Sequence, residues 1–213
     1  KNIGGIPCYV MPPRSTSDAN NIIVYMHDVS LDVGDCVPIV EVLATLFPLS
    51  HIIVPEYYGV GINMPEGAYN NAHLAMYETL MTILQKTDAR TIATANKTII
   101  IAHGHAAGVA FRAALVYPHL ALIVSMCGHS ATRYDDSQVL GTPTSILRQW
   151  TRLQSQPTPK LIVQQSTCGS SRSSYLATPG APMDDGSALQ TTVAGSILYF
   201  DNCYCDAWSI FSS

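Results

Sequence analysis

The feature that most constrains this chain is a buried strand that leads into a helix through a glycine-flanked turn. Residues 98–102 read Thr-Ile-Ile-Ile-Ala, an apolar run of strand length, and residues 109–115 carry a helical pattern. The turn between them reads His-Gly-His-Ala-Ala-Gly, so that Gly104 and Gly108 flank Ala106. Glycine permits the sharp reversal and the close helix–strand contact that such a turn needs. The segment therefore predicts a strand, a tight turn and a helix packed back on the strand.

The rest of the chain alternates short apolar runs with amphipathic stretches. Apolar residues at helical spacing predict two more helices, at 36–47 and 74–84. The apolar runs predict strands at 6–11, 21–26, 51–55, 98–102, 120–126, 160–163 and 196–200. Strands that alternate with helices indicate an α/β fold, with one mostly parallel sheet and helices on both faces. We therefore expect a single domain over residues 1–213, with an insertion at 129–158 and a loop-rich segment at 166–192.

Composition limits the classes of partner. The net charge of −4, without any basic run, lacks the electrostatic footprint of a nucleic-acid-binding protein. Charged residues make up 12% of the chain, against about 25% in an ordinary globular protein. So little charge is typical of a surface that is partly covered, by partner subunits or by lipid. A surface rich in Ser, Thr and Asn is the alternative explanation.

The cysteines and the apolar stretches indicate in which cellular compartment the protein is expected. The six cysteines include no Cys-x-x-Cys pair, so we expect reduced, mostly buried thiols. The longest apolar stretch, 106–127, is interrupted by Arg112 and Pro118, so no transmembrane span is expected. The chain begins with Lys1 rather than Met, which leaves its targeting unread. We expect an intracellular protein, with an organellar assembly, for example a mitochondrial one, as the alternative.

Four segments of the first 128 residues carry a family resemblance. They are the strand at 6–9, the strand and loop at 23–34 that contain His27-Asp28, the Tyr-x-Gly-x-Gly-like loop at 57–61 and the turn around Ala106. With them the chain resembles the α/β-hydrolase superfamily and, within it, the BEM46/ABHD17-like branch of serine hydrolases. The resemblance implies an α/β-hydrolase fold in which 129–158 forms a reduced cap.

The resembled family needs a serine at the turn, an acid after a later strand and a histidine after the last strand. The resemblance places the serine position at Ala106, the acid position at Cys168 and the histidine position at Tyr204 or Cys205. None of the seven histidines lies beyond His129. Without a nucleophile and a base, no acyl-enzyme forms by the family route. The resemblance therefore implies a degenerate triad and no catalytic residues.

The oxyanion loop is altered as well. Asp28 stands where the resembled family has glycine, and its carboxylate would oppose the charge that the loop must stabilise. The backbone N–H of Ala107 would still point toward the pocket. The resemblance implies a residual pocket lined by His27, Asp28, His105 and Ala107.

These observations favour a catalytically inactive protein that serves as a structural or accessory subunit of a larger protein assembly. A protein retained for its shape is free to lose its triad, and the low charge fits a covered surface. One alternative is a non-catalytic protein that binds a lipid or acyl ligand in the residual pocket. Another is an esterase- or thioesterase-type serine hydrolase with an inactivating Ser-to-Ala change at Ala106.

A metal site is a rival interpretation of the same region. His103 and His105, together with His27 and Asp28, are residue types that bind zinc. In the resembled family, a residue beside the nucleophile is often histidine without any metal. We therefore expect no metal and no other cofactor.

A cysteine nucleophile is the second rival. Cys127 lies at a strand end near His129, and Cys203 and Cys205 lie in the loop that lacks the histidine. Such a dyad needs spatial contact, which the sequence does not reveal. Buried structural thiols are commoner, so we expect no cysteine-dependent catalysis.

Overall fold

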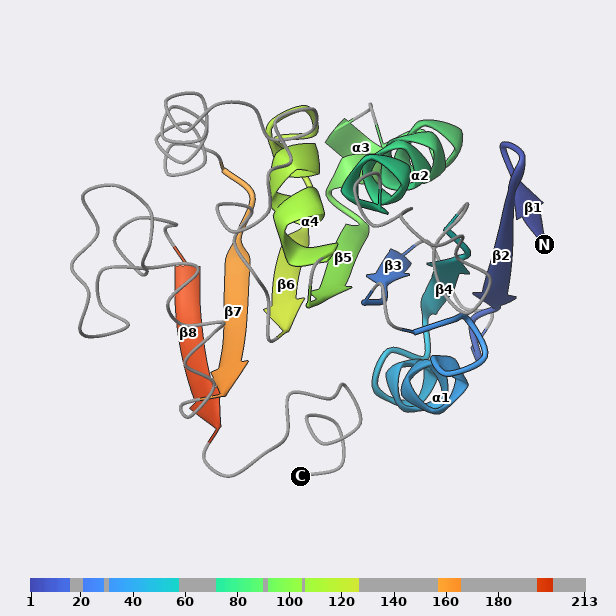
Figure 1. Ribbon diagram of the computed structural model, residues 1–213, viewed down its shortest axis with the longest axis horizontal. Coiled ribbons are helices and arrows are strands. Elements are labelled where there is room, and N and C mark those ends of the chain that lie inside the picture. The colour runs from blue at the N-terminus through green and yellow to red at the C-terminus, as the bar shows by residue number, and fades with distance from the viewer. Residues whose placement is uncertain are drawn as a thin grey trace.

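The computed structural model describes residues 1–15, 21–28, 31–57, 72–89, 92–104, 106–126, 157–165 and 195–200. These residues form one eight-stranded sheet with helices packed against it, as Figure 1 shows. Of the reduced cap expected at 129–158, only the last two residues are described. The loop-rich segment at 166–192 lies outside the described residues, so both expectations stay predictions.

The sheet has the strand order β1-β2-β4-β3-β5-β6-β7-β8. β2 pairs antiparallel with β1 and β4, whereas the strands from β4 through β3 to β8 are parallel. The strands are β1 (Asn2–Ile3), β2 (Ile6–Met11), β3 (Asn21–Met26), β4 (Ser50–Pro55), β5 (Thr98–His103), β6 (Leu122–Met126), β7 (Lys160–Gln165) and β8 (Gly195–Phe200). The sequence prediction of a mostly parallel sheet is therefore confirmed.

Helices cover both faces of this sheet (Figure 1). One face carries α1 (Val37–Leu46), and the other carries α2 (Ala72–Lys86) and α4 (Ala106–Ala114), with the short α3 (Ile92–Ala95) leading into β5. Alternate strand residues point to opposite faces, so β3 and β5 contribute to two core clusters. Ile23 and Ile101 pack with α1, while Val24 and Ile100 pack with α2 and α4.

Most predicted elements are present within one to three residues of their expected ends. The buried strands were predictable because a parallel sheet covered on both faces requires continuous apolar runs. β1 and α3 were not predicted, because two and four residues are too short to show a periodicity. Among the described residues, no helix has both the length and the hydrophobicity of a membrane span.

Two of the cysteines lie in the described part of the chain, and both are buried free thiols. Cys36 precedes α1, is inaccessible to solvent, and its Sγ donates a hydrogen bond to the carbonyl oxygen of Asp32 at 3.2 Å. Burial raises the pKa of Cys36 from 9.0 to about 12, and the negative charges of Asp35, Asp32 and Glu56 add to the effect. The expectation of mostly buried thiols is confirmed for Cys8 and Cys36.

This environment predicts that Cys36 resists alkylation in the native protein. A raised pKa keeps the thiol neutral, so at pH 9, where an ordinary thiol is half ionised, Cys36 carries almost no thiolate. Iodoacetamide at pH 9 should leave Cys36 unmodified in the folded chain and modify it fully in urea, as measured by peptide mass spectrometry. Rapid modification of Cys36 in the folded chain would contradict this assignment.

Candidate functional site

The candidate site lies at the carboxyl ends of β3 and β5, which are neighbours in the sheet. Met26, the last residue of β3, pairs with Ala102 of β5. His27 and Asp28 follow β3, and Gly104 follows β5, so these residues emerge at the same edge. Ligands of open α/β sheets bind at this edge, beyond the carboxyl ends of the strands.

Gly104 has the backbone conformation that makes the turn. Its φ of 57° is left-handed, a region that glycine enters without a steric penalty. The Gly104 N–H donates a hydrogen bond to the carbonyl oxygen of Met126 at 3.0 Å, which ties the turn to β6. Among the described residues other than glycine, only Asp88 has a positive φ. Gly104, two residues before Ala106, therefore contributes a left-handed residue to the turn between β5 and α4.

Asp28 occupies the space in front of Gly104. A Cβ atom added to Gly104 would lie 2.7 Å from Asp28 Cγ and closer still to Oδ2. Real Cβ atoms do not approach other heavy atoms to within 3.0 Å. At this turn, the Asp28 carboxylate therefore lies where a side chain at position 104 would begin.

Ala106 and Ala107 both belong to the core rather than to an open surface. They form the first turn of α4, are inaccessible to solvent and pack in the cluster that contains Met26 and Ala102. The assignment of Ala106 to the nucleophile position, and of Ala107 to a pocket, stays a prediction. The other predicted positions, His105, Cys168, Tyr204 and Cys205, lie outside the described residues.

His27 is buried and connects the ends of two strands. Its Nδ1 lies 2.9 Å from the carbonyl oxygen of Asp28, and its Nε2 lies 3.1 Å from that of Pro55, the last residue of β4. The ring lies against Tyr57, with centroids 4.2 Å apart, and the Tyr57 hydroxyl donates to the His27 carbonyl oxygen at 3.0 Å. Both ring nitrogens face backbone carbonyl groups, so His27 supports the edge of the site.

The metal interpretation receives no support from the described residues. Within the ranges that the structure describes, no three His, Cys, Asp or Glu side chains are grouped so that they could hold a metal ion. His27 directs both ring nitrogens to carbonyl oxygens. The expectation of no metal stays a prediction, because His105 lies outside those ranges.

Two buried phenols lie beneath the site and cannot serve as bases near neutral pH. Burial raises the pKa of both Tyr25 and Tyr57 well above 10, and the negative charge of Asp28 raises both further. The Tyr25 hydroxyl has no hydrogen-bond partner within the described part of the chain. Proton abstraction by either phenol is therefore disfavoured.

Sequence reasoning missed the role of Gly104. The glycines at 104 and 108 directed attention to the residue midway between them, whereas the strand continues to His103 and the turn follows at once. The end of the apolar run at Ala102 was the available signal. Gly104 lies two residues after Ala102, so a turn expected soon after the apolar run would have been placed at Gly104.

No protein-family model matches the chain, and no curated protein sequence matches it. Solved structures do match over nearly its whole length. Est1E from Butyrivibrio proteoclasticus, solved with ferulic acid, has a TM-score of 0.67 at 11% identity, covering 99% of this chain and 93% of Est1E. Esterase PE8 has a TM-score of 0.62 at 16% identity, covering 97% of each chain.

A third structure is a serine-to-alanine variant of the meta-cleavage product hydrolase from Pseudomonas fluorescens, complexed with acetates. It has a TM-score of 0.58 at 13% identity, covering 94% of this chain and 88% of that one. Identities of this size show the fold alone. The protein therefore has the α/β-hydrolase fold.

Proposed function

We propose that this chain is a catalytically inactive α/β-hydrolase-like protein that acts as a structural or accessory subunit of a larger assembly. The observation that carries the proposal is the close contact between Gly104 and the Asp28 carboxylate. In the turn after β5, where hydrolases of this fold present a nucleophile, the described residue Gly104 has no side chain. A carboxylate fills the adjoining space.

The chemistry of acyl transfer fails at this arrangement in two ways. Gly104 offers no hydroxyl or thiol to attack a carbonyl carbon, and the turn 103–108 contains no Ser, Thr or Cys. The negative charge of Asp28 would also lie close to a developing oxyanion. Because an oxyanion is stabilised by donors and positive charge, a nearby carboxylate raises the barrier instead of lowering it.

Membership of the BEM46/ABHD17-like branch and loss of the whole triad remain part of the proposal. Their support is the sequence of the first 128 residues and the lack of any histidine among residues 130–213. The esterase or thioesterase alternative, with Ser replaced by Ala at Ala106, has weaker support. Ala106 is inaccessible to solvent at the start of α4 and packs in the hydrophobic core, which favours a structural role for its side chain.

The role as a subunit is supported by apolar surface around the end of α1. Leu46, Phe47 and Leu49 are 60%, 40% and 39% exposed, and they lie within four consecutive residues. Adjacent exposed apolar side chains mark surfaces that other molecules cover. Because only 12% of the residues are charged, we propose that other protein subunits cover this surface, with a lipid surface as the alternative.

Binding of an acyl ligand without turnover is the second candidate function. The acetate-bound hydrolase variant described above carries alanine in place of a serine. That variant shows that a protein of this fold can bind acetate when one of its serines is replaced by alanine. The carboxylate of Asp28 argues against an anionic ligand beside Gly104 in this chain.

The first prediction is that a fluorophosphonate probe does not label this chain. The same result is expected for Ala106→Ser, for Gly104→Ser and for Asp28→Gly combined with Gly104→Ser, because a serine without a base stays unreactive. Labelling is measured by in-gel fluorescence beside an active serine esterase. Labelling of the native chain would overturn the proposal. Labelling of Ala106→Ser alone would instead favour the disabled-esterase alternative.

The second prediction tests the contact between Asp28 and Gly104. Gly104→Ala destabilises the protein in two ways, because alanine is strained at a left-handed φ and its Cβ clashes with Asp28. Gly5→Ala has only the first effect, because Gly5 has a φ of 94° and no atom lies within 4 Å of its added Cβ. We expect about 1 kcal/mol for Gly5→Ala and about 1–3 kcal/mol more for Gly104→Ala, from urea unfolding.

The control for that contact is Asp28→Ala, which removes the carboxylate. In the Asp28→Ala background, Gly104→Ala should cost at least about 0.5 kcal/mol less than in the native chain, because neighbours that clash are coupled. Equal costs for Gly104→Ala in the two backgrounds would show that Asp28 does not fill the space in front of the turn.

The third prediction concerns assembly. In a gentle extract of its native source, the chain should migrate on native electrophoresis in a particle far larger than its own mass of 23.0 kDa. Leu46→Glu, which places a charge on the exposed apolar surface, should reduce the share of chain in that particle, and Thr45→Glu next to it serves as the control. Migration of the native chain as a monomer would contradict the subunit role.

A further inference from the structure

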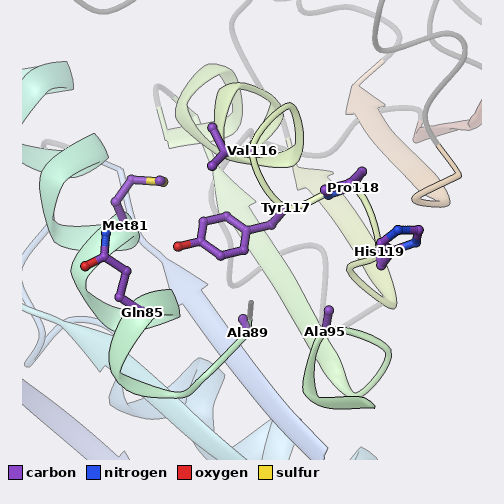
Figure 2. A pocket seen from close by; sticks show the side chains of 8 residues that line it. All are labelled: Met81, Gln85, Ala89, Ala95, Val116, Tyr117, Pro118 and His119. Carbon is purple, nitrogen blue, oxygen red and sulfur yellow. The ribbon is translucent and has the colours of Figure 1, made fainter. Parts of the chain in front are cut away.

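The structure contains a cavity at the opposite edge of the sheet from the Gly104 turn. It has a volume of about 360 Å³ and lies where α2 ends, α3 leads into β5 and the segment after α4 leads into β6. Figure 2 shows the lining side chains Met81, Gln85, Ala89, Ala95, Val116, Tyr117, Pro118 and His119. The nine-residue helix α4, about 13 Å long, separates this cavity from the turn.

Backbone hydrogen bonds hold the walls of the cavity in place. Asp88 has a φ of 58° just after α2, and the Ala89 N–H then donates to the carbonyl oxygen of Leu84 at 2.9 Å. The carbonyl oxygen of Ala95 accepts from the Ala121 N–H at 3.0 Å. These contacts keep two small side chains at the wall, so the cavity is formed before any ligand arrives. A preformed cavity binds with less loss of conformational entropy.

The interior is apolar and the rim is polar. Ala89, Ala95 and Tyr117 are buried, whereas Gln85 and His119 are exposed. In Figure 2 the Tyr117 ring lies across the middle, with its hydroxyl toward Met81 and Gln85, and His119 lies on the other side. Among the lining residues that the structure describes, none is Lys, Arg, Asp or Glu. Such a lining gives no partner to a charged ligand and favours a neutral one.

The dimensions and the chemistry limit the ligand further. A volume of 360 Å³ equals that of about twelve water molecules in the liquid, which corresponds to a ligand of about ten non-hydrogen atoms. The Tyr117 ring and the Met81 sulfur both make favourable contacts with aromatic rings. The Gln85 amide offers a donor and an acceptor at the rim.

The geometry points to a second binding site, independent of the Gly104 turn, for a small neutral aromatic molecule that carries one hydrogen-bonding N–H or O–H group. The ring fits among Met81, Ala95 and Tyr117, and the polar group meets Gln85. This site does not depend on whether the chain is catalytic, because α4 separates it from the turn.

Indole, a neutral bicyclic aromatic molecule with one N–H, is the probe. Titration into the native chain, followed by ligand-detected NMR, should show saturable binding with a Kd of ~1 mM or lower, which the efficiency of small ligands allows. Ala95→Leu fills the cavity and should weaken binding at least tenfold. Val116→Trp, at a rim position 52% exposed, should do the same without touching the core.

The control is Val37→Trp, at a 37% exposed position on α1 across the sheet, which should bind indole as the native chain does. Circular dichroism verifies that each variant is folded. If Ala95→Leu does not fold, the result for Val116→Trp decides the outcome. Binding that fails to saturate, or that is equal in the native chain and Val116→Trp, would overturn the proposal.

Discussion

The parallel register between β3 and β5 is the constraint on which the rest of this site depends. Because Met26 pairs with Ala102, the residues that follow the two strands meet at one edge of the sheet. That edge brings the Asp28 carboxylate into the space in front of Gly104. Residue 104 must then be glycine for two reasons, since its φ is left-handed and no Cβ has room beside Asp28.

The helix after the turn explains why small side chains follow Gly104. Eight of the nine residues of α4 are buried, and five of the nine are alanine besides one glycine. Small side chains let α4 pack closely against β5 and α2 on the same face of the sheet, where Ala106 and Ala110 share a core cluster with Leu80. Ala106 is accounted for by this packing.

The fold could be predicted from the sequence to a large extent, and the site much less so. Runs such as 99–102 and 22–26 are continuously apolar because both faces of their strands are covered, and this pattern is visible without a structure. The turn was ambiguous because Gly104 could be either the turn residue itself or one of the two glycines that flank Ala106. The φ of Gly104 distinguishes the two, and φ depends on where the strand ends and how α4 packs.

By itself, the sequence determined that the chain alternates strands with helices and that the turn 103–108 contains no Ser, Thr or Cys. Both properties are local, because they depend on residue type and on periodicity along the chain. Only the tertiary structure decided that Asp28 lies against Gly104, and that Met81, Ala95 and Tyr117 line one cavity. These contacts join segments far apart in the chain, and they follow from strand pairing and helix packing that no local pattern specifies.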